Sequence, residues 1–152
     1  MYLKLTNTQK YALIDDEDYG KVKKWSWRLH KGYVVRSSNG RTSLHREVAR
    51  RANILIEGKQ VDHIDRDGTN CMRKNLRSCS PLQNSMNRFL PKRNNSSNRY
   101  RGVRLHRTKK MWIASLSKKD LGLFPSEEEA AVRYNEAGKE LYGDFFIPNV
   151  IQ

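Results

Sequence analysis

The chain has 152 residues, with 30 Lys and Arg against 16 Asp and Glu and a formal net charge of +14. This excess predicts a polyanionic partner, and nucleic acid is favoured over a membrane surface because no basic amphipathic helix with a bulky apolar face is evident. The sequence also has no apolar run of about 18–20 residues and only two cysteines, which excludes a membrane span, a disulfide scaffold and a four-cysteine zinc site.

The first predicted elements surround a group of acidic residues in this basic chain. A helix is expected to begin at "LHRE". Further on, "QVDHI" (60–64) and "NLRSC" (75–79) predict two short strands joined by a loop rich in turn residues. A second helix is expected from Pro81, with Ser80 as its N-cap. This part of the chain therefore predicts a strand, a long loop, a strand and a helix.

The side chains of these elements suit hydrolysis of a phosphodiester. Asn84 and Asn87 are about one helical turn apart, so either can face the strand that carries Asp62 and His63. A neutral histidine can take a proton from water, and carboxylate and amide oxygens suit magnesium or manganese. For the two residues "DH" alone, a structural histidine in a polar turn is the favoured interpretation. A calcium loop is a poorer alternative, because the spacing is wrong and no Glu closes the loop.

The complete pattern "LHREV…VDHID.DGTN…KNLR…QN..N" closely resembles the HNH homing-endonuclease family, in the version whose third motif residue is Asn. The resemblance covers nearly all of residues 2–90. It implies that His63 is the general base that activates water. It also implies that Asp62 and Asn84 bind one divalent cation, magnesium or manganese, and that Asn75 holds the loop so that His63 is correctly oriented.

Other residues near the motif have predicted supporting roles. Asp65 and Asp67 are expected to shape the turn, with contact to a cation as a less favoured role. His45 is interpreted as structural rather than as a contact to DNA phosphate. The predicted phosphate contacts near the cleavage point are Arg73, Lys74 and Arg77.

The cysteines and two tryptophans are expected to serve the fold. Cys71 and Cys79 are predicted to be buried or half-buried thiols, because the further ligands of a zinc site are missing. Trp25 and Trp27 could stack on bases, but at least one of them is expected in the core.

The stretch "PKRNNSSN" (91–98) is polar, contains no aliphatic or aromatic residue, and has the composition of a linker. We therefore place a nuclease domain at 1–90 and a second domain at 99–149. Three strands are predicted in the second domain: "YRGVRLH" (100–106), "MWIASLS" (111–117) and "DLGLF" (120–124).

A helix is predicted after these strands, with Ser126 as its N-cap and Gly143 at its end. The positions expected on its sheet-facing side are Ala130, Tyr134, Ala137 and Leu141. The helix is expected to cover the sheet face that holds Val103 and Ile113. On charge alone, a solvated basic surface is an equally good interpretation of the opposite face.

The second domain closely resembles the APETALA-type domain of plant ethylene-response factors across Tyr100–Asn149. The resemblance implies a sheet that lies in the major groove of double-stranded DNA. The groove-facing residues that it implies are Arg101, Arg104, His106, Ser115 and Ser117. In the basic turn, Lys109 and Lys110 are expected to contact phosphates.

Together these features predict an α+β protein: an HNH module with a ββα-metal core and extra N-terminal strands and helix, followed by a three-stranded antiparallel sheet on one helix. The predicted function is site-specific DNA cleavage by a phage or mobile-element enzyme, in the cytoplasm of a prokaryotic or phage-infected cell. A monomer would cut one strand at a time, and a homodimer both. A DNA-binding regulator with an inactive nuclease module is the alternative. An RNA-binding protein is disfavoured because no aromatic platform is evident.

Overall fold

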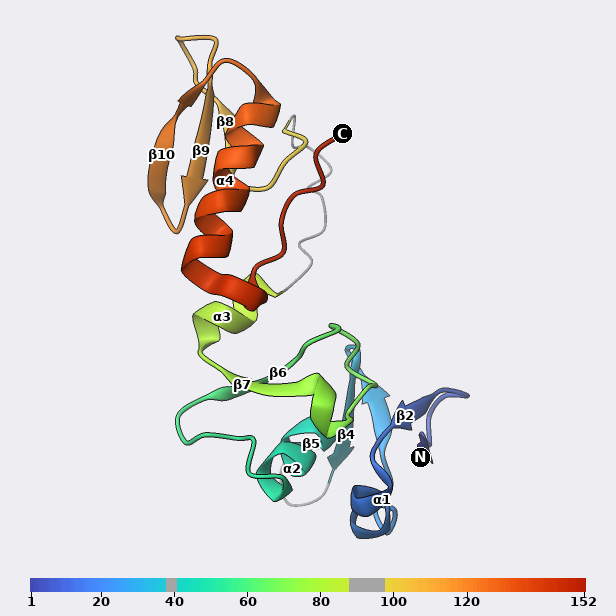
Figure 1. Cartoon of the computed structure of the whole chain (residues 1–152). Coiled ribbons are helices and arrows are strands. Elements are labelled where there is room, and N and C mark those ends of the chain that lie inside the picture. Colours follow the sequence, from blue (N-terminus) through green and yellow to red (C-terminus); the bar gives the residue numbers. More distant parts are fainter. Residues whose placement is uncertain (38–40, 88–97) are drawn as a thin grey trace. The chain divides into compact units, whose positions relative to one another are not determined.

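Figure 1 shows the computed structural model, which describes residues 1–37, 41–87 and 98–152. The chain divides into two compact units, Met1–Ser85 and Met86–Gln152, and each has its own hydrophobic core. The predicted linker at 91–98 lies outside the described residues apart from Asn98. The limits of the two predicted domains therefore stay predictions.

The first unit is built from small antiparallel sheets and short helices. A hairpin of β1 (Tyr2–Lys4) and β2 (Tyr11–Leu13) precedes helix α1 (Asp16–Val22). A three-stranded sheet follows, in the order β3 (Arg28–His30), β4 (Tyr33–Ser37) and β5 (Arg41–Ser43). Helix α2 (Leu44–Arg51) begins directly after β5, as "LHRE" predicted. The unit ends with the antiparallel pair β6 (Gln60–His63) and β7 (Leu76–Cys79) and with α3 (Pro81–Met86).

The core of the first unit joins residues of the β1–β2 hairpin, α1, β4, α2 and the β6–β7 pair. Helix α2 buries Leu44, Val48 and Ala49 in it, because these residues share one helical face. Trp27 is only 1% exposed, and its indole N–H donates to the carbonyl of Val22 at 3.0 Å. The prediction that at least one of the two tryptophans is in the core is thus confirmed. Both cysteines are free buried thiols, as predicted.

The segment from β6 to α3 follows the order of strand, long loop, strand and helix that the sequence predicted. The β6–β7 register places Asp62 opposite Arg77, and the 3-10 helix η1 (Arg73–Asn75) leads from the long loop into β7. The predicted N-terminus of α3 is also observed. Gln83 N–H donates to Ser80 Oγ at 3.2 Å, and Ser80 N–H donates to Gln83 Oε1 at 2.8 Å. This reciprocal pair satisfies two backbone donors that the helix itself cannot.

The second unit is a three-stranded antiparallel sheet with one long helix. The strands are β8 (Val103–Leu105), β9 (Trp112–Leu116) and β10 (Lys119–Phe124), in the order β10-β9-β8. Helix α4 (Glu127–Tyr142) lies along the sheet in Figure 1, and the short η2 (Gly143–Phe145) follows it. Ser126 caps the helix by accepting the N–H of Glu129 at 3.1 Å, as predicted.

Two glycines allow the close contacts of this unit. Gly102 has φ +75°, and a Cβ on it would lie 2.1 Å from the ring of Tyr134. A Cβ on Gly138 would lie 2.1 Å from the ring of Phe146. Both rings belong to the core of this unit, so any larger residue at either glycine would force that core apart.

Three details of the predicted sheet and helix are wrong. Ile113 does not share the covered face with Val103: it lies opposite Arg104 in the β8–β9 register, whereas Val103 lies opposite Ala114. Because side chains alternate along a strand, Ile113 belongs to the face that carries Arg104. Ser117 lies in the turn after β9, with φ +49°, and not on the strand. Leu141 is 61% exposed, although it follows the spacing of the buried helix positions.

The described residues thus form a mixed α and β fold of small sheets and four α-helices. None of these helices combines the length and the apolar character that crossing a membrane requires.

Candidate active site

The strand β6 carries one predicted catalytic residue, His63, and one predicted metal ligand, Asp62. Side chains alternate along a strand, so Gln60 and Asp62 share one face while His63 points to the other. Asn84 of α3 donates its amide N–H to Gln60 Oε1 at 2.7 Å. The structure therefore brings Asn84 to the strand face that carries Asp62, with His63 at the end of the same strand.

His63 is 4% exposed and lies among rings from other elements of the first unit. Its ring centroid is 4.7 Å from that of His45, on α2, and 5.9 Å from that of Tyr33, on β4. The Cys71 sulfur is 3.9 Å from its Nε2. Burial lowers the pKa of His63, although the carboxylates of Asp65, Asp62 and Asp67 oppose the shift. The imidazole is therefore neutral near neutral pH, which is the form that a general base needs.

His45 is a structural neighbour of this histidine. It is 8% exposed, and burial, followed by the charges of His63 and Arg46, lowers its pKa to about 3. A neutral ring at this position avoids placing a cation beside the neutral imidazole of His63. This environment agrees with the interpretation of His45 as structural.

Asn75 connects the long loop to the start of β7. Its side-chain oxygen accepts the N–H of Asp65 at 3.0 Å, and its amide nitrogen donates to Asp65 Oδ1 and to the carbonyl of Asn70, both at 2.8 Å. The backbone carbonyl of Asn75 also accepts the N–H of Ile64 at 2.8 Å, directly after His63. One buried amide thus fixes the chain on both sides of the loop.

The two further aspartates of the motif accept hydrogen bonds from the loop itself. Asp65 Oδ1 accepts the N–H of Asp67 at 2.9 Å. Asp67 Oδ1 accepts both the N–H and the hydroxyl of Thr69, at 2.8 and 2.7 Å. These contacts are the ones expected of carboxylates that shape a turn.

The guanidinium groups of Arg73 and Arg77 are engaged by carboxylates of the first unit. Arg73 donates to both oxygens of Asp18, from Nε at 2.7 Å and from Nη2 at 2.9 Å, and pairs with Glu17 at 2.7 Å. Arg77 donates to Asp62 Oδ2 from Nε at 3.0 Å, with its Nη2 at 2.9 Å from the same oxygen. Their predicted phosphate contacts stay untested. Lys74, between them, is exposed.

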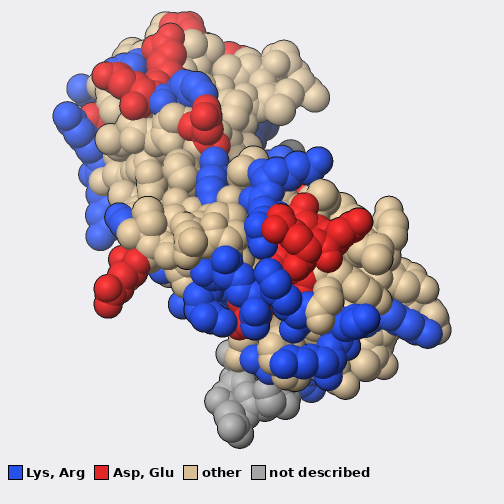
Figure 2. Space-filling view, turned by 60° about the horizontal axis from the view of Figure 1, so that its bottom comes forward, with Lys and Arg blue, Asp and Glu red and all other residues tan. Residues whose placement is uncertain are grey.

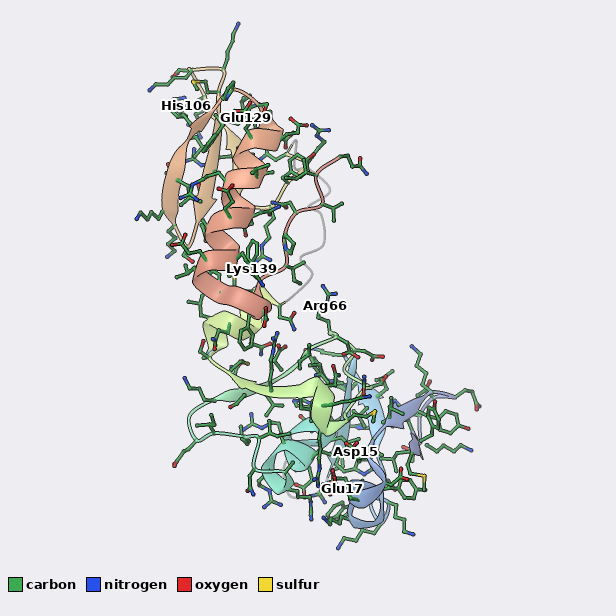
Figure 3. The ribbon with its side chains drawn as sticks, viewed as in Figure 1. Asp15, Glu17, Arg66, His106, Glu129 and Lys139 are labelled. Atoms are coloured by element: carbon green, nitrogen blue, oxygen red, sulfur yellow. The ribbon has the colours of Figure 1, made fainter. Side chains whose placement is uncertain are left out.

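In the second unit, three of the predicted DNA contacts, Arg104, Ser115 and His106, lie on or next to the strands β8 and β9. Arg104 pairs with Asp120 at 2.9 Å, and Ser115 donates to the same carboxylate at 2.6 Å. A shallow hollow is lined by Arg104, His106, Arg107, Ile113, Asp120, Gly122 and Leu123. Figure 3 shows His106 at the end of this sheet, where its Nδ1 accepts the N–H of Lys109 at 3.3 Å.

The remaining predicted contacts differ in how far they are available to a ligand. Lys109 and Lys110 are exposed in the β8–β9 turn. Arg101 is half-buried, and its Nη2 lies 3.6 Å from the sulfur of Met86. The hydroxyl of Ser117 bonds the hydroxyl of Tyr142, at the end of α4. Figure 2 shows Lys and Arg side chains spread over much of the visible surface, with acidic side chains in separate groups.

The residues on the Asp62 face of β6 fit a divalent cation with few protein ligands. Asp62 supplies a carboxylate, and Asn84 supplies an amide oxygen because its nitrogen is bound to Gln60. Magnesium commonly takes one or two carboxylates and keeps several waters. Among the described residues, no group of three or more His, Cys, Asp or Glu side chains could hold a metal ion.

Three residues of this region were not predicted as part of the site. Gln60 positions Asn84, and its place two residues before Asp62 is a period-two signal that the sequence offered. Tyr33 and Asp18 come from elements far away in the sequence, and no local pattern connects them with the motif.

A comparison with protein families matches this same part of the chain. The model of a family described as HNH endonuclease matches residues 43–86, which include Asp62, His63, Asn75 and Asn84. An uncharacterized HNH endonuclease of Acanthamoeba polyphaga mimivirus is 36% identical over 151 residues, covering 93% of this chain and 75% of the viral protein. No solved structure matches the chain significantly.

Proposed function

The chain belongs to the HNH endonuclease family, and from this premise we propose that it is a site-specific DNA endonuclease with one divalent cation and a histidine general base. The observation that supports the proposal is that Asp62 and His63 are neighbours on β6 and that Asn84, on α3, is bonded to Gln60 of the same strand. Asn84 reaches the Asp62 face through Gln60, and Asn75 fixes the loop that follows His63.

In the proposed mechanism, a nitrogen of His63 accepts the proton of a water molecule, whose oxygen attacks the phosphorus. Asp62 and Asn84 would hold magnesium or manganese, which when bound polarises the phosphate and stabilises charge on the leaving oxygen. Attack and departure take place on opposite sides of the phosphorus.

We further propose that the second unit holds the DNA, in the manner of the APETALA-type domain that it resembles. Its exposed sheet face carries Arg104 and His106, and its β8–β9 turn carries Lys109 and Lys110. Two linked weak contacts raise the affinity for an extended site through effective concentration. This combination of cutting and recognition is what a homing enzyme of a phage or mobile element requires.

The proposed chemistry is tested by removal of the metal. We expect cleavage of plasmid DNA to stop in EDTA and to return with added magnesium or manganese. Asp62→Ala should raise the metal concentration needed for half-maximal cleavage more than Asn84→Ala does, because a carboxylate binds a hard cation more strongly than a neutral amide. Full cleavage in EDTA would exclude the proposed site.

The proposed DNA binding by the second unit is tested by comparing affinities for target and non-target duplexes. If Arg101 and Arg104 read guanine edges, changing either to Ala should weaken binding to the cleaved sequence by roughly 1–3 kcal/mol and change non-target binding much less. Lys109→Ala and Lys110→Ala should weaken both complexes about equally and reduce their salt dependence. Binding curves at two salt concentrations measure all four effects. Equal losses on both duplexes for the arginine variants would contradict a groove-reading sheet.

A further inference from the structure

The proposed metal ligand Asp62 already has a cationic partner within the fold. Arg77 lies directly opposite it in the β6–β7 register, and the Nε and Nη2 atoms of Arg77 are 3.0 and 2.9 Å from Asp62 Oδ2. The side chain of Asp62 is 7% exposed and that of Arg77 17%. The pair is therefore largely shielded from solvent, where attraction between charges is stronger than at an open surface.

The second proposed ligand, Asn84, is held differently. Asn84 donates its amide N–H to Gln60, and this contact does not use the amide oxygen of Asn84. Arg77, in contrast, engages an oxygen of Asp62, which is the kind of atom that a divalent cation would bind. Gln60 and a metal ion can therefore act on Asn84 together, whereas Arg77 and a metal ion compete for Asp62.

The positive charges of Arg77 and of a divalent cation make this competition stronger. A guanidinium group and a divalent cation on one buried carboxylate would repel each other, and a single carboxylate cannot neutralise both. A guanidinium displaced from Asp62 would remain beside the site on β7, and its planar fork suits a phosphate oxygen pair. The substrate of the proposed reaction supplies such phosphates.

We propose that Arg77 and the divalent cation are alternative partners of Asp62, so that Arg77 weakens metal binding without DNA and moves to the DNA backbone when the metal binds. This inference rests on the proposed function, because it takes Asp62 as a metal ligand. It makes metal binding and DNA binding mutually reinforcing, since each favours the arrangement in which Arg77 has left Asp62.

The first test is a calorimetric titration of the full-length protein with manganese chloride in the absence of DNA. Arg77→Gln should lower the dissociation constant for manganese at least fivefold, and Arg77→Lys should lower it by a smaller factor. Lys74→Gln is the matched control, because it removes an exposed positive charge three residues away that does not pair with Asp62 among the contacts described. It should change the constant by less than twofold.

Two results separate failure of this inference from failure of the proposed function. If Asp62→Asn abolishes manganese binding but Arg77→Gln binds no more tightly than the unaltered protein, the competition is overturned and the metal site stands. If Asp62→Asn leaves manganese binding unchanged, Asp62 is not a ligand, and the proposed function fails together with the inference.

Thermal stability gives a second readout, which applies even if Arg77→Gln is less stable than the unaltered protein. Loss of Arg77 leaves Asp62 as a buried charge without this partner, so the melting temperature in EDTA should fall. Manganese should raise it more in Arg77→Gln than in the unaltered protein. An equal rise in both would contradict the competition.

The movement of Arg77 to DNA is tested with the cleavage-deficient His63→Ala protein. Fluorescence anisotropy measures how much manganese strengthens binding to a labelled duplex. This enhancement should be at least threefold smaller in the His63→Ala, Arg77→Gln double variant. The same enhancement in both proteins would overturn the proposed release of Arg77 to the backbone.

Discussion

His63→Ala is expected to slow cleavage by a factor on the order of 10²–10⁴ while leaving duplex affinity within about twofold. The general base acts in the chemical step, where it accepts the proton of the attacking water, and it contributes little to binding. His63 also supports its neighbours, since it is 4% exposed and its ring packs on those of His45 and Tyr33. His63→Gln, which keeps more of that volume, should therefore be equally inactive and more stable.

His106→Ala is the matched control for this prediction. His106 belongs to the second unit, among the proposed DNA contacts, whereas the proposed metal ligands belong to the first unit. Its loss should weaken binding and leave the rate at saturating DNA unchanged. Single-turnover cleavage at saturating enzyme, together with a binding curve for each variant, separates the two effects. A His63→Ala rate within about threefold of the unaltered protein would remove His63 from the mechanism.

The elements around the motif could be predicted because each has a local signal. Ser80 and Gln83 form their capping box from residues three apart, and Ser126 and Glu129 repeat the pattern at α4. Such contacts depend only on nearby residues and on the geometry of a helix start. The loop aspartates are similar, because their hydrogen bonds reach at most a few residues along the chain or across one hairpin.

The partners of the arginines could not be predicted in this way. Arg73 was expected to face phosphate, yet its guanidinium lies on Asp18, which is 55 positions away in the sequence. The Asp62–Arg77 pair follows from the β6–β7 register, which only the three-dimensional pairing of the strands defines. The role of a positively charged residue in a motif can therefore be assigned only when the carboxylate nearest to it is known.

The position of Ile113 shows a second reason why part of the fold could not be predicted from the sequence. Its apolar side chain suggested the face covered by α4, but Val103 and Ala114 already occupy that face as a cross-strand pair. Ile113 is 5% exposed on the opposite side, in the hollow that Arg104 also lines. Burial there comes from long neighbouring side chains, which shield an apolar residue without any helix.

Asp18→Ala is expected to destabilise the first unit more than any other single acidic substitution in α1. Asp18 is fully buried and accepts two hydrogen bonds from the guanidinium of Arg73. Hydrogen bonds to charged groups contribute about 1.5–3 kcal/mol each, so the loss of two should lower the free energy of unfolding by about 3–6 kcal/mol. Figure 3 shows the neighbouring Asp15 and Glu17 at the same helix, and Asp15 Oδ2 accepts the N–H of Arg73 at 2.7 Å.

The position of Arg73 extends this prediction from stability to the site. Arg73 begins η1, and η1 ends at Asn75, whose side chain fixes the loop after His63. Asp18→Ala should therefore also lower the cleavage rate at temperatures at which the protein remains folded. Asp16→Ala is the matched control, since its carboxylate is 82% exposed and pairs only with the chain's N-terminus among the contacts described. Exposed pairs of this kind contribute little to stability.

In a Trp112→Phe background, the fluorescence of Trp25 and Trp27 follows urea unfolding of the first unit alone. Equal urea midpoints for Asp18→Ala and Asp16→Ala would show that the contact between Asp18 and Arg73 does not stabilise the packing of α1 on η1.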